Sequence, residues 1–214
     1  MKKIHSKRKT CRLCESKKLS LAVPLNPTPV AEKYLSKNQL SNKELIAPLD
    51  LYICKSCGHV QLLDIINPNF LYSDYTYSSG NSAGLVKHFK EYADNIIERY
   101  KPKKKSLVVD IGSNDGTLLS FFKKHGLNVL GVDPAKEIAK KASSNGIKTL
   151  PKFMNLTLSK DIRKKFGLAD IVTANNAFAH GDDLIGLLKS IKNIMKPNGI
   201  FVFEVSYLLD VIEK

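Results

Sequence analysis

The segment at residues 108–117, which reads VVDIGSNDGT, constrains the fold of this 214-residue chain more than any other. A short apolar run is followed at once by a turn that contains Gly112 and Gly116, and then by an amphipathic stretch that begins at Thr117. In open α/β sheets, ligands bind at such junctions, where a strand ends and the next helix begins. The segment therefore predicts a parallel sheet with a ligand-binding turn at its edge.

Strands and helices are predicted to alternate from Ser106 onward. Apolar runs that predict strands lie at 107–111, 128–132, 170–174 and 200–205. Helical patterns lie between them, from about 117, through 138–142 and over 182–195, with a turn at 196–199. Such alternation is typical of doubly wound α/β domains. We therefore expect an incomplete Rossmann-like sheet of about five strands over 106–214, with 200–205 left as an exposed apolar edge.

An amphipathic helix is predicted ahead of this domain. Apolar residues recur there at three- and four-residue steps, at Leu85, Phe89, Tyr92, Ile96 and Tyr100. Ser82 is suited to cap its first turn, and Pro102 stops it. Together with the lysine-rich residues that follow, this helix predicts a bridging segment over 81–105.

The cysteines indicate a metal site. All four fall in two Cys-x-x-Cys pairs, Cys11 with Cys14 and Cys54 with Cys57. Two such turns can direct four thiolates at one tetrahedral zinc ion, and a site with every position filled is structural. Four ordinary buried cysteines are the alternative, which the paired spacing disfavours. We expect a small, loop-rich zinc-binding domain over 1–80, in which the long segment between the pairs forms its own loop or hairpin.

The residue types in the turn after the first strand indicate which ligand it binds. Gly112 and Gly116 do not form the Gly-x-Gly-x-x-Gly fingerprint of dinucleotide sites, and Asp110 and Asp115 would repel a pyrophosphate. S-adenosylmethionine carries no phosphate, and its sulfonium and ammonium groups are cationic, so an acidic turn with glycines suits it. The predicted contacts on the turn are Asp110, Gly112, Ser113, Asn114, Asp115 and Gly116.

A second acidic position supports this assignment. Asp133 and Pro134 follow the second predicted strand, where a carboxylate can accept hydrogen bonds from both ribose hydroxyls. The other interpretation of Asp133 is a cap for the helix that begins near Pro134. The two roles are compatible, and both residues are counted among the cofactor contacts.

The formal charge of +14 is concentrated in residues 1–18 and in Lys101, Lys103, Lys104 and Lys105. These clusters are interpreted first as a solvated tail and linker, and second as attraction for an anionic substrate or nucleic acid. No run approaches the roughly 18 apolar residues that span a bilayer, so we expect a cytoplasmic protein without a membrane partner.

With these residues in view, nearly the whole chain resembles the sugar C-methyltransferase family, enzymes that methylate a carbon of nucleotide-linked keto-deoxysugars. The resemblance rests on the cysteine pairs, the cofactor turn and five further runs. These runs are PL at 48–49, GHVQL at 58–62, DYTYSSG at 74–80, GVDPA at 131–135 and ANNAFAH at 174–180. The resemblance implies S-adenosylmethionine as cofactor, a structural zinc ion and a nucleotide-linked keto sugar as substrate.

The resemblance also implies roles for individual residues. It implies that Tyr77, Ser79 and Gly80 contact the cofactor as their segment closes over it, and it makes Tyr77 a candidate catalytic residue. It places Asn175 and Asn176 at the carboxyl edge where the methyl group and substrate meet.

His180 follows the same strand and resembles an acid/base or substrate-positioning residue, with a loop histidine at a helix start as the alternative. Glu204 and Tyr207 resemble positions that line the pocket. The family continues into a C-terminal portion that opens with a Tyr-His-Glu-His cluster, which this sequence lacks. We therefore expect impaired turnover, with a second chain as a possible partner that completes the sheet. Two other interpretations stay open: a noncatalytic cofactor-binding subunit, and a nucleic-acid methyltransferase, which the sparse basic and aromatic residues between the cysteine pairs disfavour.

Overall fold

The computed structural model describes residues 4–73 and 75–213 of the chain, and it divides them into two compact units, Met1–Tyr77 and Ser78–Lys214. Asp74, the first residue of the DYTYSSG run, lies outside the described residues. The zinc-binding domain was predicted over 1–80, whereas the structure places Ser78, Ser79 and Gly80 in the second unit.

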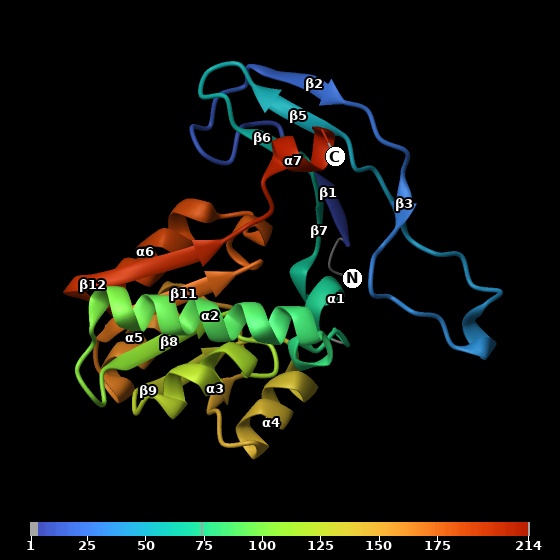
Figure 1. The fold of residues 1–214 in the computed structure, drawn as a ribbon. Helices are drawn as coiled ribbons and strands as arrows, with labels where there is room; N and C mark the ends of the chain where they lie inside the picture. Colours follow the sequence, from blue (N-terminus) through green and yellow to red (C-terminus); the bar gives the residue numbers. More distant parts are fainter. Residues whose placement is uncertain (1–3, 74, 214) are drawn as a thin grey trace. The chain divides into compact units, whose positions relative to one another are not determined.

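The first unit is built from short antiparallel strands (Figure 1). Strands β2 (Leu19–Val23), β5 (Leu51–Cys54) and β6 (Val60–Leu62) form a three-stranded sheet in that order. The segment between the cysteine pairs forms a second pairing, β3 (Thr28–Pro29) with β4 (Ile46–Ala47), around the 3-10 turn η1 (Lys37–Gln39). The segment was predicted to form its own loop or hairpin, and it forms the hairpin.

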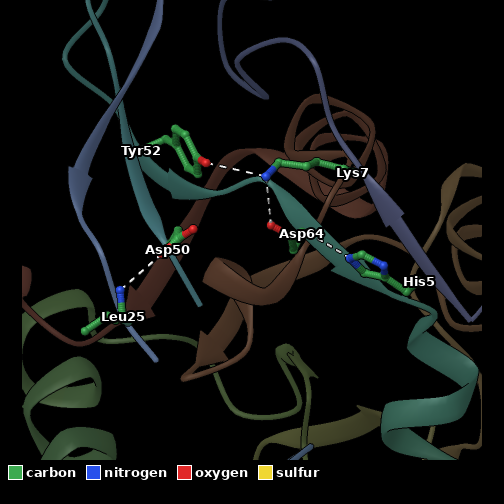
Figure 2. Close-up of polar contacts among 6 residues, drawn as sticks. All are labelled: His5, Lys7, Leu25, Asp50, Tyr52 and Asp64. Carbon is green, nitrogen blue, oxygen red and sulfur yellow. Dashed lines mark hydrogen bonds and ion pairs between the residues drawn. The ribbon is translucent and has the colours of Figure 1, made fainter. Parts of the chain in front are cut away.

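The N-terminal strand of this unit is held by a buried carboxylate. Strand β1 (His5–Lys7) pairs with β7 (Asp64–Ile66), and helix α1 (Pro68–Tyr72) follows. Figure 2 shows the Asp64 side chain, only 3% exposed, between His5 at 2.7 Å and Lys7 at 3.7 Å. Lys7 Nζ also donates to the Tyr52 hydroxyl at 3.4 Å, which ties β1 to β5.

The second unit contains a five-stranded parallel sheet in the order β10-β9-β8-β11-β12. Its strands are β8 (Leu107–Ile111), β9 (Asn128–Val132), β10 (Thr149–Leu150), β11 (Ala169–Asn175) and β12 (Met195–Glu204). The order reverses between β8 and β11, and open sheets bind ligands at the carboxyl edge of such a point. The bounds of β8 and β9 match those predicted from their apolar runs.

Helices cover both faces of this sheet (Figure 1). Val108 and Ile171 pack on one face with α2 (Ala83–Tyr100) and α3 (Thr117–Lys124). Val109 and Val172 point to the other face, which α5 (Leu156–Phe166) and α6 (Leu184–Ile194) cover. The remaining elements are the 3-10 turns η2 (Ser79–Asn81) and η3 (Phe178–His180) and the helices α4 (Lys136–Ser144) and α7 (Leu208–Glu213).

The helix predicted within the bridging segment 81–105 forms as α2, and it belongs to the second unit. Ser82 caps α2 by accepting from the Leu85 amide at 3.3 Å, and Lys101 ends it with a left-handed backbone before Pro102. This segment is therefore not a free bridge between the units, because Phe89, Ala93 and Ile96 are buried in the same hydrophobic cluster as residues of α3.

Two elements and one turn of the second unit differ from the predictions. Strand β10 and helix α5 were not placed from the sequence. The expected turn at 196–199 lies inside β12, as a register shift between Met195, which pairs with Ala169, and Ile200, which pairs with Ile171. The exposed apolar edge that was predicted at 200–205 does form, because β12 is an edge strand of the sheet and Phe203 is 49% exposed there. None of the helices in 4–73 and 75–213 combines the length and apolarity needed to cross a bilayer.

Candidate cofactor and metal sites

The four cysteines meet in the first unit. Cys11 Sγ lies 3.7 Å from Cys57 Sγ, Cys14 Sγ lies 3.6 Å from Cys54 Sγ, and all four sulfur atoms lie within 4.8 Å of one another. A tetrahedral zinc ion with Zn–S bonds of about 2.3 Å places its ligand sulfurs about 3.8 Å apart. The cluster therefore has the composition and size of a structural zinc site, and each pair supplies one buried and one exposed cysteine.

The two knuckles have matching backbones. The residue after each pair, Glu15 and Gly58, adopts a left-handed conformation, with φ of 58° and 77°. These turns direct amide groups at the sulfurs, and the Leu13 amide donates to Cys11 Sγ at 3.5 Å. Burial alone would raise the pKa of the Cys11 thiol, but the amides of Cys14 and Leu13 outweigh burial and lower the pKa to about 6.

The thiols also compete with one another for protons. The His59 amide favours the Cys57 thiolate, but the neighbouring cysteine sulfurs raise the Cys57 pKa to about 12. Four crowded sulfurs cannot all ionise without a cation, so a bound dication would be needed to hold four thiolates. Among the described residues the cluster contains cysteines alone, and His59, two positions after Cys57, is not part of it.

The cofactor turn of the second unit depends on its glycines. Gly112 has φ of 75°, and a Cβ there would lie 2.5 Å from the Ala177 Cβ. Gly116 has φ of 79°, and a Cβ there would lie 2.8 Å from Ile147 Cγ2. Both positions therefore need the left-handed backbone and the missing side chain together. The turn leaves β8 and enters α3 at the carboxyl edge of the sheet.

Asp115 ties the start of the second unit to this turn. Its Oδ2 accepts from the Gly80 amide at 2.8 Å and from the Ser78 hydroxyl, and its Oδ1 accepts from the Thr117 hydroxyl at 2.6 Å. Burial works against ionisation, but these donors outweigh it and lower the pKa of Asp115. The Ser79 amide likewise donates to Asn114 Oδ1 at 2.9 Å. The segment that was expected to close over the cofactor is thus fastened to the cofactor turn.

Asp133 joins the second strand to the same turn. Its Oδ2 accepts from the Asn114 amide at 2.8 Å, and its Oδ1 accepts from the Ala135 amide at 2.8 Å, just before α4. The contact with Ala135 resembles the capping role considered from the sequence. Each carboxylate oxygen has a second lone pair, so these bonds leave acceptors for ribose hydroxyls. Burial raises the pKa of Asp133.

Asp110 has a different environment. It lies within β8 and is 4% exposed, and its Oδ1 accepts from the Thr173 hydroxyl of β11 at 2.7 Å. Burial raises the pKa of Asp110 to about 7, although the bond from Thr173 acts in the opposite direction. The carboxyl group therefore cross-links two strands at the switch point beneath the turn.

Two family models match the chain. The model described as "Putative zinc binding domain" matches residues 11–72, and the model described as "Methyltransferase domain" matches residues 86–212, more than half of the chain. The chain belongs to the methyltransferase family. The methyltransferase assignment and the cysteine geometry confirm the fold class, an incomplete Rossmann-like sheet preceded by a small zinc-binding domain, and they confirm S-adenosylmethionine and zinc as its cofactors.

Two curated proteins that resemble this chain are also methyltransferases. The chain is 30% identical to the C-methyltransferase NovU of Streptomyces niveus, over 95% of this chain and 48% of the relative. It is 26% identical to the ubiquinone biosynthesis O-methyltransferase of Vibrio parahaemolyticus, over 49% of this chain and 48% of the relative. The chain thus spans about half the length of these curated relatives.

A solved structure supports the fold alone. The crystal structure of the PH0226 protein from Pyrococcus horikoshii OT3 matches with a TM-score of 0.50 and 18% identity. The match covers 64% of this chain and 62% of that one.

The chain presents buried polar atoms at the carboxyl edge of the sheet, beside the cofactor turn, as a ligand site requires. Within the described part of the chain, Ser113 Oγ and both side-chain atoms of Asn175 are buried without a hydrogen-bond partner. Buried polar groups are nearly always paired in a complete site, so these atoms suit contact with a polar ligand. Gly131 makes room for Ser113, because a Cβ there would clash with the Ser113 hydroxyl. The residues present therefore fit S-adenosylmethionine.

The other predicted residues occupy the following places. Asn176 has φ of 50° and donates its amide to the Glu204 carbonyl at 2.8 Å. His180 is exposed at the end of η3, and Tyr207 is exposed after β12. Tyr77 is the last residue of the first unit, where its ring lies 6.4 Å from that of Tyr75. The functional roles of these residues remain predictions.

Where α2 meets the carboxyl edge, two helix residues that sequence reasoning missed, His88 and Tyr92, join the predicted Asn175 and Glu204 in a polar cluster. His88 Nε2 lies 2.7 Å from Glu204 Oε2, and the Tyr92 hydroxyl faces Asn175 without reaching hydrogen-bond geometry. Burial raises the pKa of Tyr92. The helical pattern predicts Tyr92 only as part of the apolar face of the helix, and none of the sequence motifs contains His88.

Proposed function

We propose that this methyltransferase is the cofactor-binding part of an enzyme that transfers a methyl group to a carbon of a nucleotide-linked keto-deoxysugar. The observation that carries the proposal is the 30% identity to a C-methyltransferase over 95% of this chain. That match extends through the cysteine unit and the Rossmann-like unit together, whereas the O-methyltransferase relative covers about half of the chain. The DYTYSSG and ANNAFAH runs support it further, and in the first run the amides of Ser79 and Gly80 donate to side chains of the cofactor turn.

The proposed reaction is a carbon alkylation. The sugar ketone acidifies the neighbouring C–H bond, a base removes the proton, and the resulting enolate carbon forms a bond to the methyl group while the methyl–sulfur bond breaks. S-adenosylmethionine, when bound, supplies the electrophilic methyl group. The protein must hold donor and acceptor carbon about 3 to 3.5 Å apart and direct hydrogen-bond donors at the enolate oxygen.

This chain's own residues have defined parts in the proposal. Asp133 accepts from the ribose hydroxyls, and the turn from Gly112 to Gly116 allows close approach of the backbone to the cofactor. Ser79 and Gly80, held by Asn114 and Asp115, lie against the cofactor, together with Tyr77 from the neighbouring segment. His180 donates to the enolate oxygen or to the sugar.

The proton-abstracting base is proposed to come from the part of the relatives that this chain does not match, since they are about twice as long. A partner polypeptide or further sequence would then continue the sheet beside β12. Phe178, Phe201 and Phe203 form an aromatic cluster there, with centroids 5.2 to 5.7 Å apart, and Val205 is 39% exposed. An unpaired apolar edge strand is a template for such pairing.

Calorimetric titration of the zinc-loaded chain with S-adenosylhomocysteine, with NAD as the control ligand, tests the cofactor site. Binding of the first ligand alone supports the proposal, and binding of NAD instead contradicts it.

Addition of a dTDP-linked 4-keto-6-deoxyhexose and the missing half of a relative should then give a methylated sugar by mass spectrometry. Cofactor binding without turnover in that assembly favours a noncatalytic subunit, and methylation of RNA favours the nucleic-acid alternative.

A further inference from the structure

A hollow of about 510 Å³ lies at the edge of the sheet opposite the cofactor turn. Its wall contains residues at the starts of four strands: Lys105 before β8, Asn128 at β9, Lys148 before β10 and Lys196 at β12. The amino ends of parallel strands share one edge, whereas the cofactor turn follows the carboxyl end of β8. The hollow is therefore separate from the cofactor site, and it lies within the second unit.

The hollow carries an excess of positive charge. Four lysines and one aspartate line it. Asp170 is already neutralised, because Lys196 Nζ lies 2.7 Å from its Oδ1 and the Leu107 amide donates to its Oδ2 at 3.0 Å. Lys105 and Lys148 are exposed and pair with no carboxylate of residues 4–73 and 75–213. Charges of one sign around a concave surface focus its potential on an oppositely charged ligand.

Helix termini do not account for this charge. Lysines commonly lie near helix C-termini, where the helix dipole favours a positive charge. That explains Lys123, which lies in the last turn of α3 and donates to the Gly146 carbonyl at 2.8 Å. Lys105, Lys148 and Lys196 lie outside the helices, at the starts of strands. Their convergence on one hollow therefore needs another explanation.

The hollow also offers apolar surface beside the charges. Phe166, at the end of α5, is half-buried in its wall, and Leu127 and Leu168 are further lining residues. Lys148 Nζ lies 5.1 Å from the centroid of the Phe166 ring. A ligand that matches this lining would combine several negative charges with a flat or apolar part.

We infer that the hollow binds a small organic polyphosphate, with its phosphates among Lys105, Lys148 and Lys196 and its apolar part against Phe166. Its volume lies within the range of small-molecule sites, and ammonium groups bind phosphate as point charges. A nucleic acid would call for an extended basic strip rather than a hollow with an apolar wall. The inference does not depend on the proposed methyl transfer.

The test is calorimetric titration of the full, zinc-loaded chain with ADP, in the presence of saturating S-adenosylhomocysteine to occupy the cofactor site. The variant Lys105→Ala/Lys148→Ala removes two charges from the hollow, and Lys87→Ala/Lys140→Ala removes two exposed charges elsewhere in the same unit. We expect ADP to bind at least tenfold more weakly to the first variant and within twofold of the wild type to the second. No binding by the folded wild type, or equal weakening in both variants, overturns the inference.

Nuclear magnetic resonance locates the bound ADP. The amide signals of Asn128 and Gly167 should shift, whereas those of Gly112 and Asp133 should not. Shifts confined to the cofactor turn would mean that ADP occupies that site and would overturn the inference. A single-stranded RNA that binds more tightly than ADP, and that both double variants weaken alike, would indicate general attraction of polyanions instead. Matching melting temperatures establish that both variants fold.

Discussion

His88 Nε2 and Glu204 Oε2 lie 2.7 Å apart, although the two residues are 116 positions apart in the sequence. The contact joins α2 to the end of β12, and Glu204 is the register partner of Asn175 at the carboxyl edge. The side chains are 46% and 35% exposed, so solvent screens the pair and its contribution to stability is at most about 1 kcal/mol. Because the pair lies beside Tyr92 and Asn175 at the carboxyl edge, we propose that it takes part in the site instead.

We predict that His88→Ala and Glu204→Gln each change the free energy of unfolding by less than about 1 kcal/mol in urea titrations. In an assembly that methylates the proposed sugar, each variant should lower kcat/KM about tenfold or more, because a hydrogen-bonded group is lost at the carboxyl edge, where the substrate is proposed to bind. Lys90→Ala, which removes an exposed ion pair with Asp94 on the same helix, serves as the control. A loss of stability well above this value would instead assign the pair to holding α2 in place.

Replacing Asp115 should loosen the segment that it holds. In Asp115→Asn, one carboxylate oxygen becomes an NH2 group, so the side chain can no longer accept from Gly80 and Ser78 at one atom and from Thr117 at the other. Bonds to charged groups contribute about 1.5 to 3 kcal/mol, so we expect S-adenosylhomocysteine to bind at least tenfold more weakly. Asp161→Asn, at an exposed position on α5, is the matched control. Unchanged affinity of Asp115→Asn for S-adenosylhomocysteine would mean that residues 78–80 do not contact the cofactor.

Two glycine variants isolate the close approach at the cofactor turn. Gly112 and Gly126 both have positive φ, but a Cβ meets Ala177 at the first and nothing within 4 Å at the second. Gly126→Ala should cost about 1 to 2 kcal/mol from backbone strain alone. Gly112→Ala should cost about 1 to 3 kcal/mol more because of overpacking, and it should abolish binding of S-adenosylhomocysteine. Equal losses of stability in denaturant titrations would mean that the backbone at Ala177 yields.

Removal of zinc should unfold the first unit. Structural zinc contributes about 10 to 16 kcal/mol of binding free energy in small domains, more than such a domain gains from its core. We expect native mass spectrometry to find one zinc ion per chain, and a chelator to make all four thiols reactive toward a thiol reagent. Zinc should also be lost on acidification, since its ligands must be thiolates. Slow reaction of only the exposed Cys14 and Cys57 after chelation would mean that the unit folds without metal.

Local patterns predicted four of the five strands of the second unit and the turn after β8, but contacts between distant segments could not be predicted. The β8 turn was recognisable because an apolar run, two glycines and a helical pattern follow one another. Strand β10 has two residues, too few for a periodic signal. The predicted turn at 196–199 contains Pro197 and Gly199, residues typical of turns, yet an edge strand tolerates both at a register shift.

The site itself shows the same division. The cysteine pairs, the glycines and Asp133 belong to short motifs, whereas the partners of Asp115 lie 35 and 37 positions upstream and are set by the fold. The turn was predicted to use Asp115 to attract a cationic ligand. That role stays a prediction, and the carboxylate also accepts hydrogen bonds from Ser78, Gly80 and Thr117, a combination that no single-sequence pattern reveals.

Asp110 should make stability depend on pH in the direction opposite to an ion-paired carboxylate. Burial raises its pKa to about 7 in the folded protein, against about 3.9 in the unfolded chain. Between these values the folded state binds more protons, so the contribution of Asp110 is fully present below about pH 4 and is lost as the pH rises to about 7. In Asp110→Asn, the amide oxygen can still accept from Thr173, but nothing titrates. The stability of the variant relative to the wild type should therefore increase by a few kcal/mol between pH 4 and pH 8 in urea titrations. Parallel pH profiles for the two proteins would mean that Asp110 ionises normally, and that the burial of its carboxyl group is relieved by water or by a donor beyond Thr173.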